Sequence, residues 1–389
     1  MDASFEFGTI EWLGLILTII PVFLLLHTYL FYPLSQLLRP KSFPNYSSNF
    51  QPHVTVLLAV FNEKDIIEQK MQSMVNSNYP FEKLQFIIGS DCSDDGTNEI
   101  IERFTQEFSN IQFFPFETRR GKAVVMEDLL TRVTGEIIVF TDADTLFRTE
   151  TISRLVAPFQ DPTIGGVQGN FSSIALDRTD ALQQESFFNR IEMAIKMRQS
   201  KQGTVIGAIG SIFAIRKDLY ETVPYGIIVD DFFLFMSVLR KGFRTVFAEK
   251  SISDLYVSGD PILQFRRKKR IGSGNFMAYF IFRSMSWPWK GRVGYHFFSY
   301  KVLRWFGPFL MIMAILGFFI LFPWLAMVGL LAVGGVLLLD WLFRKNEIKV
   351  GLFRYPAHFF WMNAAMFLGF FQYVLRGNSA VWNNPKKLG

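Results

Sequence analysis

The sequence predicts an α/β domain, built on a doubly wound, mostly parallel sheet and flanked by transmembrane helices. Two observations support this fold class. Short apolar runs alternate with helical stretches through the middle of the 389-residue chain, and this alternation is typical of right-handed crossovers between parallel strands. Long uncharged segments lie before and after the middle region, and about 20 apolar residues are enough to span a bilayer as a helix.

Composition and charge narrow the class of protein. Half of the residues are hydrophobic, 16% are aromatic and only 19% are charged, which excludes a disordered chain or a nucleic-acid-binding tail. We therefore expect no nucleic-acid partner. The net charge of +6 indicates either a polyanionic partner or basic loops beside membrane segments. Cys92 is the only cysteine in the sequence, so an intrachain disulfide and a cysteine-rich zinc site are both excluded.

The first expected membrane helix covers residues 12–32, which include no Asp, Glu, Lys or Arg. The charged residues before it are all acidic, whereas the basic residues Arg39 and Lys41 follow it. Basic residues concentrate on the cytoplasmic side of membrane proteins, so the N-terminus is expected outside and the following region in the cytoplasm. Because no basic residue precedes the apolar run, a cleaved signal peptide is disfavoured.

Two more apolar segments lie near the C-terminus. Residues 305–339 are uncharged and are interrupted by Pro323, which predicts a tight hairpin of two helices. Residues 355–375 also lack Asp, Glu, Lys and Arg. Four spans would leave the basic tail 377–389 outside, so either this tail departs from the charge rule or one apolar segment is re-entrant.

The middle region contains three apolar runs typical of buried strands, at residues 53–60, 84–89 and 136–141. Helical stretches at 63–76 and 98–108 lie between them. In doubly wound sheets, ligands bind beyond the carboxyl ends of the strands. The polar residues that follow each strand are therefore the first candidates for a functional site.

Acidic or amide side chains follow all three strands. They are Asn62 and Glu63 after the first strand, Asp91 and Asp95 after the second, and Asp142 and Asp144 after the third. An Asp-x-Asp pair suits a hard divalent cation that bridges carboxylate and diphosphate oxygens, although the same pattern also caps helices. Asp91 and Asp95 fit either hydrogen bonding to a nucleoside or ordinary turn chemistry. No nucleoside-triphosphatase phosphate loop and no dinucleotide fingerprint occurs at these turns.

Basic residues could neutralise a diphosphate. Arg120 and Lys122 either lie in a solvated turn or bind a diphosphate, and we favour the second interpretation. The five consecutive cations at 266–270 either contact anionic lipid or stabilise a diphosphate leaving group. The aromatic segment 275–289, interrupted by Arg283, predicts an interfacial amphipathic helix.

Two adjacent acids, Asp230 and Asp231, precede an apolar helix. One of them could cap that helix while the other acts as a general base. Adjacent carboxylates repel, and the repulsion raises one pKa toward a range that suits proton transfer.

This ordered set of motifs resembles the membrane-integrated family 2 glycosyltransferases, which include cellulose, hyaluronan and poly-N-acetylglucosamine synthases and ceramide glucosyltransferase. The likeness covers about residues 52–305. The matching motifs are Asn62-Glu63, Asp91-Cys-Ser-Asp-Asp-Gly-Thr97, Gly121-Lys122, Asp142-Ala-Asp144, Gly207-Ala-Ile-Gly-Ser-Ile-Phe-Ala-Ile-Arg216 and Asp230-Asp231. Each motif is weak alone, whereas their order is specific.

The chain departs from the family pattern in two places. The family's Gln/Arg-x-x-Arg-Trp motif fits either Gln264-x-x-Arg267 or Arg267-x-x-Arg270, and we prefer the second because it retains Gly274. The tryptophan is missing in both registers, which leaves processivity and acceptor identity open. Asp230 replaces the usual Glu and keeps its charge.

The resemblance implies a GT-A type nucleotide-diphospho-sugar transferase domain that transfers a sugar with inversion from a donor expected to be UDP-linked. The implied site residues are Asn62, Glu63, Asp91, Asp95, Lys122 and Asp142 for the nucleotide sugar, Asp142 and Asp144 for Mg²⁺ or Mn²⁺, Gly207, Gly210 and Ser211 for the acceptor, and Asp231, Asp230, Arg267 and Arg270 for catalysis. Asp231 takes the role of base by its position in the motif.

The implied function is addition of sugars to a polysaccharide at the cytoplasmic face. Transfer of a single sugar to a membrane lipid and an inactive sugar-nucleotide-sensing scaffold are the alternatives. The expected domains are a transmembrane helix at 1–35, a cytoplasmic GT-A domain at 50–260, a basic motif with interfacial helices at 261–298, about three transmembrane helices at 299–376 and a tail at 377–389. We expect a bacterial inner (plasma) membrane protein that contacts membrane lipids, with a partner subunit or a homo-oligomer as a further possibility.

Overall fold

The structure is a computed structural model that describes residues 8–38, 46–47, 49–175, 180–257, 260–346 and 351–376. The expectations that concern Arg39, Lys41 and the tail 377–389 lie outside the described residues.

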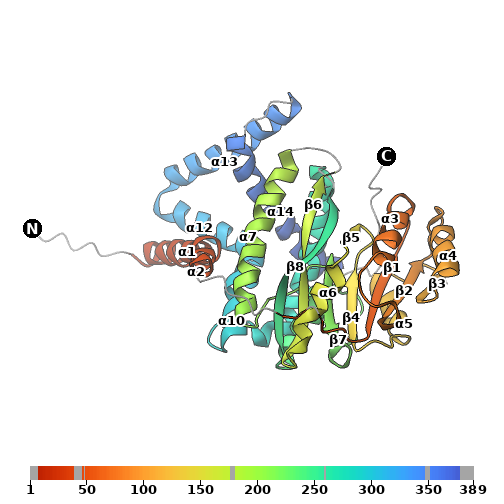
Figure 1. Cartoon of the computed structure of the whole chain (residues 1–389). Helices are drawn as coiled ribbons and strands as arrows, with labels where there is room; N and C mark the ends of the chain where they lie inside the picture. The colour runs from red at the N-terminus through yellow and green to blue at the C-terminus, as the bar shows by residue number, and fades with distance from the viewer. Residues whose placement is uncertain are drawn as a thin grey trace, which may run out of the picture.

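One eight-stranded sheet forms the centre of the molecule (Figure 1). Its strands are β1 Val54–Val60, β2 Leu84–Asp91, β3 Ile111–Phe116, β4 Ile137–Thr141, β5 Thr145–Phe147, β6 Ile164–Ala175, β7 Ile212–Arg216 and β8 Arg244–Val257. They are ordered β3-β2-β1-β4-β7-β6-β8-β5. Four of the seven pairings are parallel, and the antiparallel ones join β7 to β4 and β6, and β5 to β8. The predicted α/β fold with a doubly wound sheet is confirmed, as a mixed sheet.

The three strands expected from the sequence correspond to β1, β2 and β4. Every residue of β1 is buried, as expected of a strand with neighbours on both sides and helices over both faces. β1 pairs with β2 on one side and with β4 on the other. The direction of strand progression therefore reverses at β1, and such switch points hold the ligand crevice in doubly wound folds.

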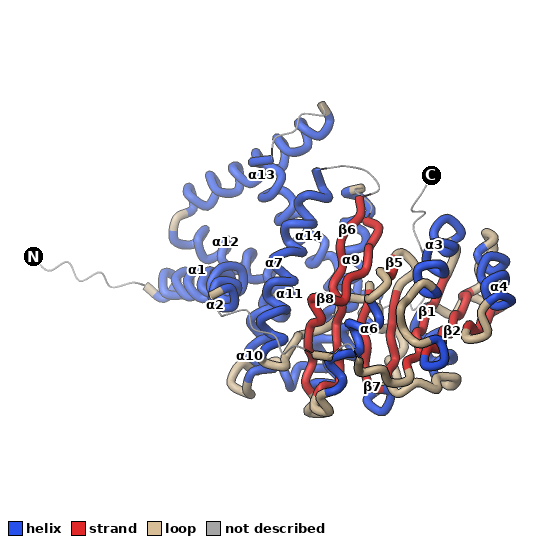
Figure 2. The backbone as a smooth tube through the Cα atoms, viewed as in Figure 1, coloured by secondary structure: helices blue, strands red, loops and turns tan. Residues whose placement is uncertain are grey.

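Helices cover both faces of the sheet (Figure 2). The longer ones in this part of the chain are α3 Lys64–Val75, α4 Thr97–Glu107, α5 Lys122–Leu130, α7 Asp180–Lys201 and α8 Asp230–Arg240, joined by the short α6 Thr151–Val156 and single turns at Phe81–Lys83, Ala157–Gln160 and Lys217–Leu219. The helices expected at 63–76 and 98–108 are α3 and α4. Apolar stripes on these helices pack on the sheet, for example Ile67, Met71 and Met74 of α3, which are all fully buried.

The remaining helices precede or follow the sheet domain. They are α1 Thr9–Leu26, a π-helical turn His27–Phe31, α2 Tyr32–Leu37, α9 Pro261–Phe282, a turn Arg283–Met285, α10 Arg292–His296, a π-helical turn Phe297–Val302, α11 Leu303–Trp305, α12 Gly307–Leu321, α13 Pro323–Lys345 and α14 Gly351–Arg376. Figure 1 shows α1, α12 and α13 on the side of the molecule away from β3. A Cβ at Gly317 would lie 2.7 Å from the carbonyl oxygen of Gly14, so α1 and α12 pack backbone to backbone, as small residues allow between membrane helices.

Two of the described helical segments are long and apolar enough to cross a membrane, Thr9–Leu37 and Pro323–Phe343. A third is possible if Arg292–Trp305 and Gly307–Leu321, bent by 66° at their junction, act as one span. The helix break expected at Pro323 is present. Four spans were expected, and the described residues provide two or three. α12 has 15 residues and counts only together with Arg292–Trp305, and polar residues such as Asn363 interrupt the apolar sequence of α14.

The segment expected to form a separate interfacial helix continues α9 as far as Phe282. Two of its rings face protein, since Phe276 and Phe282 are fully buried and the ring of Phe276 lies 5.0 Å from that of Phe370 in α14. Phe280, Trp287 and Trp289 are exposed. A Cβ at Gly272 would lie 3.6 Å from the Cα of Gly369. α14 therefore packs closely on α9, directly after its basic stretch.

Candidate functional site

An acidic cluster with a central lysine occupies the switch point. Asp142 follows β4, Asp230 opens α8, and Lys122 opens α5. The Lys122 Nζ lies 2.8 Å from Asp142 Oδ1 and 3.5 Å from Asp230 Oδ2. Burial alone would lower the pKa of Lys122, but these carboxylates outweigh it and raise that pKa. Lys122 is therefore a permanent cation that joins three elements at the carboxyl ends of the strands.

Asp231 lies in the same cluster, next to Asp230. Burial and the neighbouring Asp230 carboxylate raise the pKa of Asp231 to about 6. Its Oδ1 accepts a hydrogen bond of 2.7 Å from the backbone N–H of Phe232. The N-cap residue of α8 is Val229. The expectation that one of the two acids caps this helix is therefore wrong. Asp231 is left as a carboxylate whose pKa suits proton transfer near neutral pH.

A glycine keeps the space between these carboxylates open. A Cβ at Gly210 would lie 3.2 Å from Asp142 Oδ2 and 3.4 Å from Asp231 Oδ2. Any other residue would therefore press on Asp142 and touch Asp231. The neighbouring residues are held against the sheet, because the Ser211 carbonyl accepts a 3.0 Å hydrogen bond from Thr141 Oγ1. Gly210 thus borders a gap that the two carboxylates share.

The donors at this gap fit a hard divalent cation. Asp142 and Asp144 supply carboxylate oxygens from one turn, and Asp142 Oδ2 faces the space beside Gly210. Within the described part of the chain, no three His, Cys, Asp or Glu side chains are grouped so as to hold a metal ion. Mg²⁺ is commonly held by one or two carboxylates together with substrate phosphates and water. The residues therefore fit Mg²⁺ or Mn²⁺ that arrives with a phosphorylated ligand.

Lys70, which was not predicted from the sequence, holds the residues on either side of this turn. Lys70 is fully buried on α3, and its Nζ donates to Thr141 Oγ1 at 2.8 Å and to the Thr145 carbonyl at 2.5 Å. Burial lowers the pKa of Lys70 to about 7, against the opposing effect of the Asp142 and Asp144 carboxylates. The sequence did hold a signal, because Lys70 interrupts the apolar stripe of α3.

Lys196 on α7 was also missed. It is fully buried and donates to Gln168 Oε1 at 2.5 Å and to the Gly207 carbonyl at 2.9 Å. Gly207 has a φ of +71°, which favours glycine. Burial and the nearby Lys301 ammonium lower the pKa of Lys196 to about 7. Lys196 therefore anchors the start of the Gly207–Ser211 segment, and no sequence motif marks it.

Asp91 is engaged by the loop before α5. Its carboxylate accepts hydrogen bonds from the backbone N–H groups of Arg120, at 2.7 Å, and Gly121, at 3.0 Å, and pairs with Arg119 Nε at 3.3 Å. Gly121 has a φ of +88°, which allows its N–H to turn toward Asp91. Asp91 is 2% exposed and fixes the loop that leads to Lys122.

Asp95 is engaged by its own turn. Its Oδ1 accepts from the Thr97 N–H and hydroxyl, and its Oδ2 accepts from the Lys64 N–H at 3.1 Å. Burial would raise the pKa of Asp95, but these hydrogen bonds lower it. Asp95 thus makes the turn contacts that were one of its two possible roles.

Asn62 and Glu63 connect β1 to that turn. Asn62 has a left-handed φ of +51°, and its side chain donates to Asp94 Oδ1 at 2.8 Å and accepts from the Asp94 N–H at 3.0 Å. The Glu63 N–H donates to Thr97 Oγ1 at 2.9 Å. These residues therefore hold together the loops after β1 and β2, at one edge of the crevice.

The basic stretch of α9 reaches the acidic cluster through Arg270, which is close enough to interact electrostatically with Asp142, Asp230 and Asp231. Arg267 lies beside Arg270, one turn earlier on α9. A Cβ at Gly274 would lie 3.0 Å from Ile228, so this glycine lets α9 approach the segment before Asp230. This packing favours the Arg267-x-x-Arg270 register.

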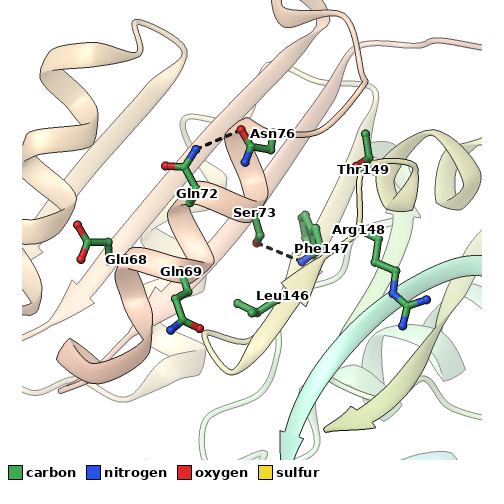
Figure 3. Close-up of a pocket in the computed structure, with 9 residues that line it drawn as sticks. All are labelled: Glu68, Gln69, Gln72, Ser73, Asn76, Leu146, Phe147, Arg148 and Thr149. Atoms are coloured by element: carbon green, nitrogen blue, oxygen red, sulfur yellow. Dashed lines mark hydrogen bonds between the residues drawn. The ribbon is translucent and has the colours of Figure 1, made fainter.

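A different cavity lies between α3 and β5. It has a volume of about 740 Å³ and is open to the surface. Figure 3 shows Glu68, Gln69 and Gln72 on α3 and Leu146 and Arg148 from the β5 region along its walls. None of the residues predicted from the sequence lines it. The acidic cluster at the switch point is therefore the better candidate site.

Known proteins resemble this chain in sequence and in fold. Residues 55–223 match the model of the glycosyl transferase family 2 domain. The structure of a mannosyltransferase from Pyrobaculum calidifontis in complex with GDP-Man and Mn²⁺ is similar over 94% of this chain and 99% of its own, with a TM-score of 0.70 and 21% identity. At that identity the similarity shows a shared GT-A fold.

Two curated relatives are similar in sequence. A poly-β-1,6-N-acetyl-D-glucosamine synthase of Staphylococcus epidermidis is 27% identical over 177 residues, 44% of this chain and 41% of that protein. A β-monoglucosyldiacylglycerol synthase of Trichormus variabilis is 25% identical over 179 residues, 45% of this chain and 37% of that protein. The matched region spans less than half of either relative.

Proposed function

We propose that this chain, whose residues 55–223 form a glycosyl transferase family 2 domain, transfers a sugar from a nucleoside diphosphate sugar to an acceptor hydroxyl, with inversion at the anomeric carbon. One observation carries the proposal. The carboxylates of Asp142 and Asp231 approach the same gap beside Gly210, the first next to the Lys122 cation and the second with a raised pKa. The groups that would bind the diphosphate and the base that would accept the proton therefore lie close enough to contact the same sugar.

In this mechanism Asp231 accepts the proton of the acceptor hydroxyl as the oxygen attacks the anomeric carbon. The bond from that carbon to the diphosphate breaks, and the electron pair leaves with the nucleoside diphosphate. Lys122 and Arg270 stabilise the charge on the departing diphosphate, an effect typically worth about 2.7–4 kcal/mol per donor. Mg²⁺ or Mn²⁺ held by Asp142 and Asp144 would add positive charge for the same diphosphate.

The loops at the edge of the crevice would receive the nucleoside. Asn62, Glu63 and Asp91 border it, and we propose that Asp91 exchanges a loop contact for a base N–H when a UDP-linked donor binds. Asp95 would act indirectly, by holding the turn. Gly207, Gly210 and Ser211 would line the acceptor side.

We propose a polysaccharide acceptor, by similarity to the poly-β-1,6-N-acetyl-D-glucosamine synthase. A membrane lipid acceptor is the second candidate, favoured by the small number of apolar helices. The described residues contain two or three candidate spans, and so few helices form little wall for a polymer channel within one copy of the chain. In either case we propose that the helical segment Thr9–Leu37 anchors the chain, with the catalytic domain at the cytoplasmic face of a bacterial inner membrane.

The test is nucleotide release by the purified full-length protein, supplied with UDP- and GDP-linked sugars in turn. We expect one UDP-sugar to be hydrolysed or transferred, with loss of activity in EDTA and recovery with Mn²⁺ or Mg²⁺. Sizing of the product separates a polymer from a singly glycosylated lipid. No release from any sugar nucleotide, with binding of the nucleotide intact, would instead favour a sugar-nucleotide-sensing scaffold.

A further inference from the structure

A basic cavity lies away from the acidic cluster, at the carboxyl end of α7. Its volume is about 790 Å³. The residues that matter for its chemistry are Arg198, Lys201, Gln202, Trp289, Arg292 and His296. Three of the lining residues are Lys or Arg, and none is acidic. The charge of the cavity therefore selects an anion.

Two buried donors in this cavity lack a partner among the described residues. Arg198 is 7% exposed, and its Nη atoms donate to the carbonyls of Ala194, at 2.7 Å, and Leu37, at 3.3 Å. Its Nε, and the Nε2 of Gln202, have no hydrogen-bond acceptor within the described part of the chain. Buried donors are nearly always satisfied in folded proteins. An anionic oxygen in the cavity would satisfy both.

The cavity lies where two apolar elements reach their polar ends. Leu37, whose carbonyl Arg198 binds, ends the candidate span Thr9–Leu37, and Arg292 begins the bent pair Arg292–Trp305 and Gly307–Leu321. His296 Nδ1 lies 2.8 Å from the Tyr32 hydroxyl of the first span. Figure 1 shows α10 near the carboxyl end of α7, and both helices contribute lining residues. The site therefore belongs to the boundary between apolar helices and the sheet domain.

Exposed tryptophans stand beside the cavity. The rings of Trp287 and Trp289 lie 4.8 Å apart and are 49% and 74% exposed. Tryptophan is enriched at the level of lipid headgroups, where its ring is partly apolar and its N–H remains hydrated. Exposed rings next to cations match that environment better than they match bulk solvent.

We infer that this cavity binds the phosphate of an anionic phospholipid headgroup at the membrane surface. The inference rests on the proposed membrane attachment and does not depend on sugar transfer. Lys201 and Arg292 are exposed and would contact the phosphate from outside, while Arg198 and Gln202 would bind it from within. Bound lipid would then hold the end of the first span against α7.

The test uses the full-length protein in a neutral detergent, titrated with dioctanoyl phosphatidylglycerol, dioctanoyl phosphatidylcholine and inorganic phosphate. The double variant Lys201→Gln/Arg292→Gln removes the two exposed cations without touching Arg198. The control, Arg103→Gln/Lys250→Gln, removes two exposed cations that do not line the cavity. We expect the cavity variant to bind phosphatidylglycerol about 25-fold more weakly, roughly fivefold for each cation, and the control to stay within twofold of the wild type.

Equal affinity of the cavity variant and the wild type for phosphatidylglycerol would overturn the inference. The inference would also be overturned if the wild type bound phosphatidylcholine as tightly as phosphatidylglycerol. It would likewise be overturned if inorganic phosphate bound as tightly as phosphatidylglycerol and lost as much affinity in the cavity variant. Nucleotide release is measured on the same samples, and we expect both double variants to retain it. Absence of release in all samples would refute the proposed transfer while leaving the lipid result decisive.

Discussion

The carboxylates at the crevice form two groups that differ in their partners. Asp91 and Asp95 accept hydrogen bonds from backbone N–H groups of nearby loops. Asp142, Asp230 and Asp231 instead face one another and share Lys122 across three elements. Backbone donors hold the loops that border the crevice, whereas carboxylates crowded around one cation can exchange partners with a diphosphate or with an acceptor hydroxyl. The comparison predicts that the first group shapes the crevice and the second carries the chemistry.

The largest expected effect comes from Asp231→Asn. The change is nearly isosteric, and the amide oxygen can still accept the Phe232 N–H bond, so the fold should persist. It removes the proton acceptor, and general-base catalysis typically contributes about 10²–10⁴-fold in rate. We expect kcat for sugar transfer to fall by that factor while the Kd of UDP, measured by calorimetry, changes less than threefold.

Asp230→Asn is the matched control, since it removes the adjacent charge and should lower the rate less. Near-normal turnover of Asp231→Asn together with an inactive Asp230→Asn would assign the base to Asp230 and shift the motif register by one residue.

Lys122→Met should have the next largest effect. It removes the shared cation and leaves Asp142 and Asp230 facing each other without a counter-charge, so the bound diphosphate loses one donor. We expect UDP affinity to fall about 10–100-fold, within the range typical of losing a charged hydrogen-bond partner. Arg120→Gln is the comparison variant. The sequence favoured a diphosphate-binding role for Arg120 as well, but its guanidinium pairs with the half-buried Asp128, so we expect this variant to change UDP affinity less than twofold. Equal losses of UDP affinity in both variants would contradict the proposal that Lys122 binds the diphosphate and Arg120 does not.

The pH dependence of kcat/KM should report the pKa of Asp231. This pKa is raised to about 6, and only the deprotonated carboxylate accepts a proton. Activity should therefore fall tenfold per pH unit below about pH 6. Asp230→Asn removes the neighbouring negative charge, which lowers the pKa of Asp231 and shifts the acid limb to lower pH. An acid limb that does not move in this variant would contradict the coupling between the two acids.

Three parallel strands were predictable from sequence because β1, β2 and β4 are continuous apolar runs, and β1 and β2 are each followed by a helix. β3 was not predicted, nor was the parallel pairing of β6 with β8. The antiparallel part was not predicted. β7 is inserted between β4 and β6, and this pairing joins residues about 70 positions apart, as in Thr141 with Ile212. No local pattern specifies such a pairing. The strand order therefore depends on packing across the whole domain.

The candidate site divides in the same way. Asp142, Asp144, Asp230 and Asp231 were found because each stands at the end or start of a regular element. Lys70 and Lys196 were missed because their partners are distant in sequence and neither lysine belongs to a motif. The sequence also could not decide whether Asp95 forms the turn or binds a ligand, since the same Asp-Gly-Thr pattern is compatible with both roles.

Asp95→Ala should have the smallest effect on sugar transfer. This variant tests the first group of carboxylates, Asp91 and Asp95. The variant loses the hydrogen bonds to Thr97 and Lys64, and loss of such side-chain hydrogen bonds costs about 1 kcal/mol of stability. We expect that loss in urea unfolding, with KM for the donor and kcat unchanged within twofold. Asp128→Ala, a half-buried acid outside the turn, should lower stability less. If KM for the donor instead rose tenfold or more at unchanged stability, Asp95 would bind the nucleotide directly. The proposed difference between carboxylates that shape the crevice and carboxylates that act in it would then be wrong.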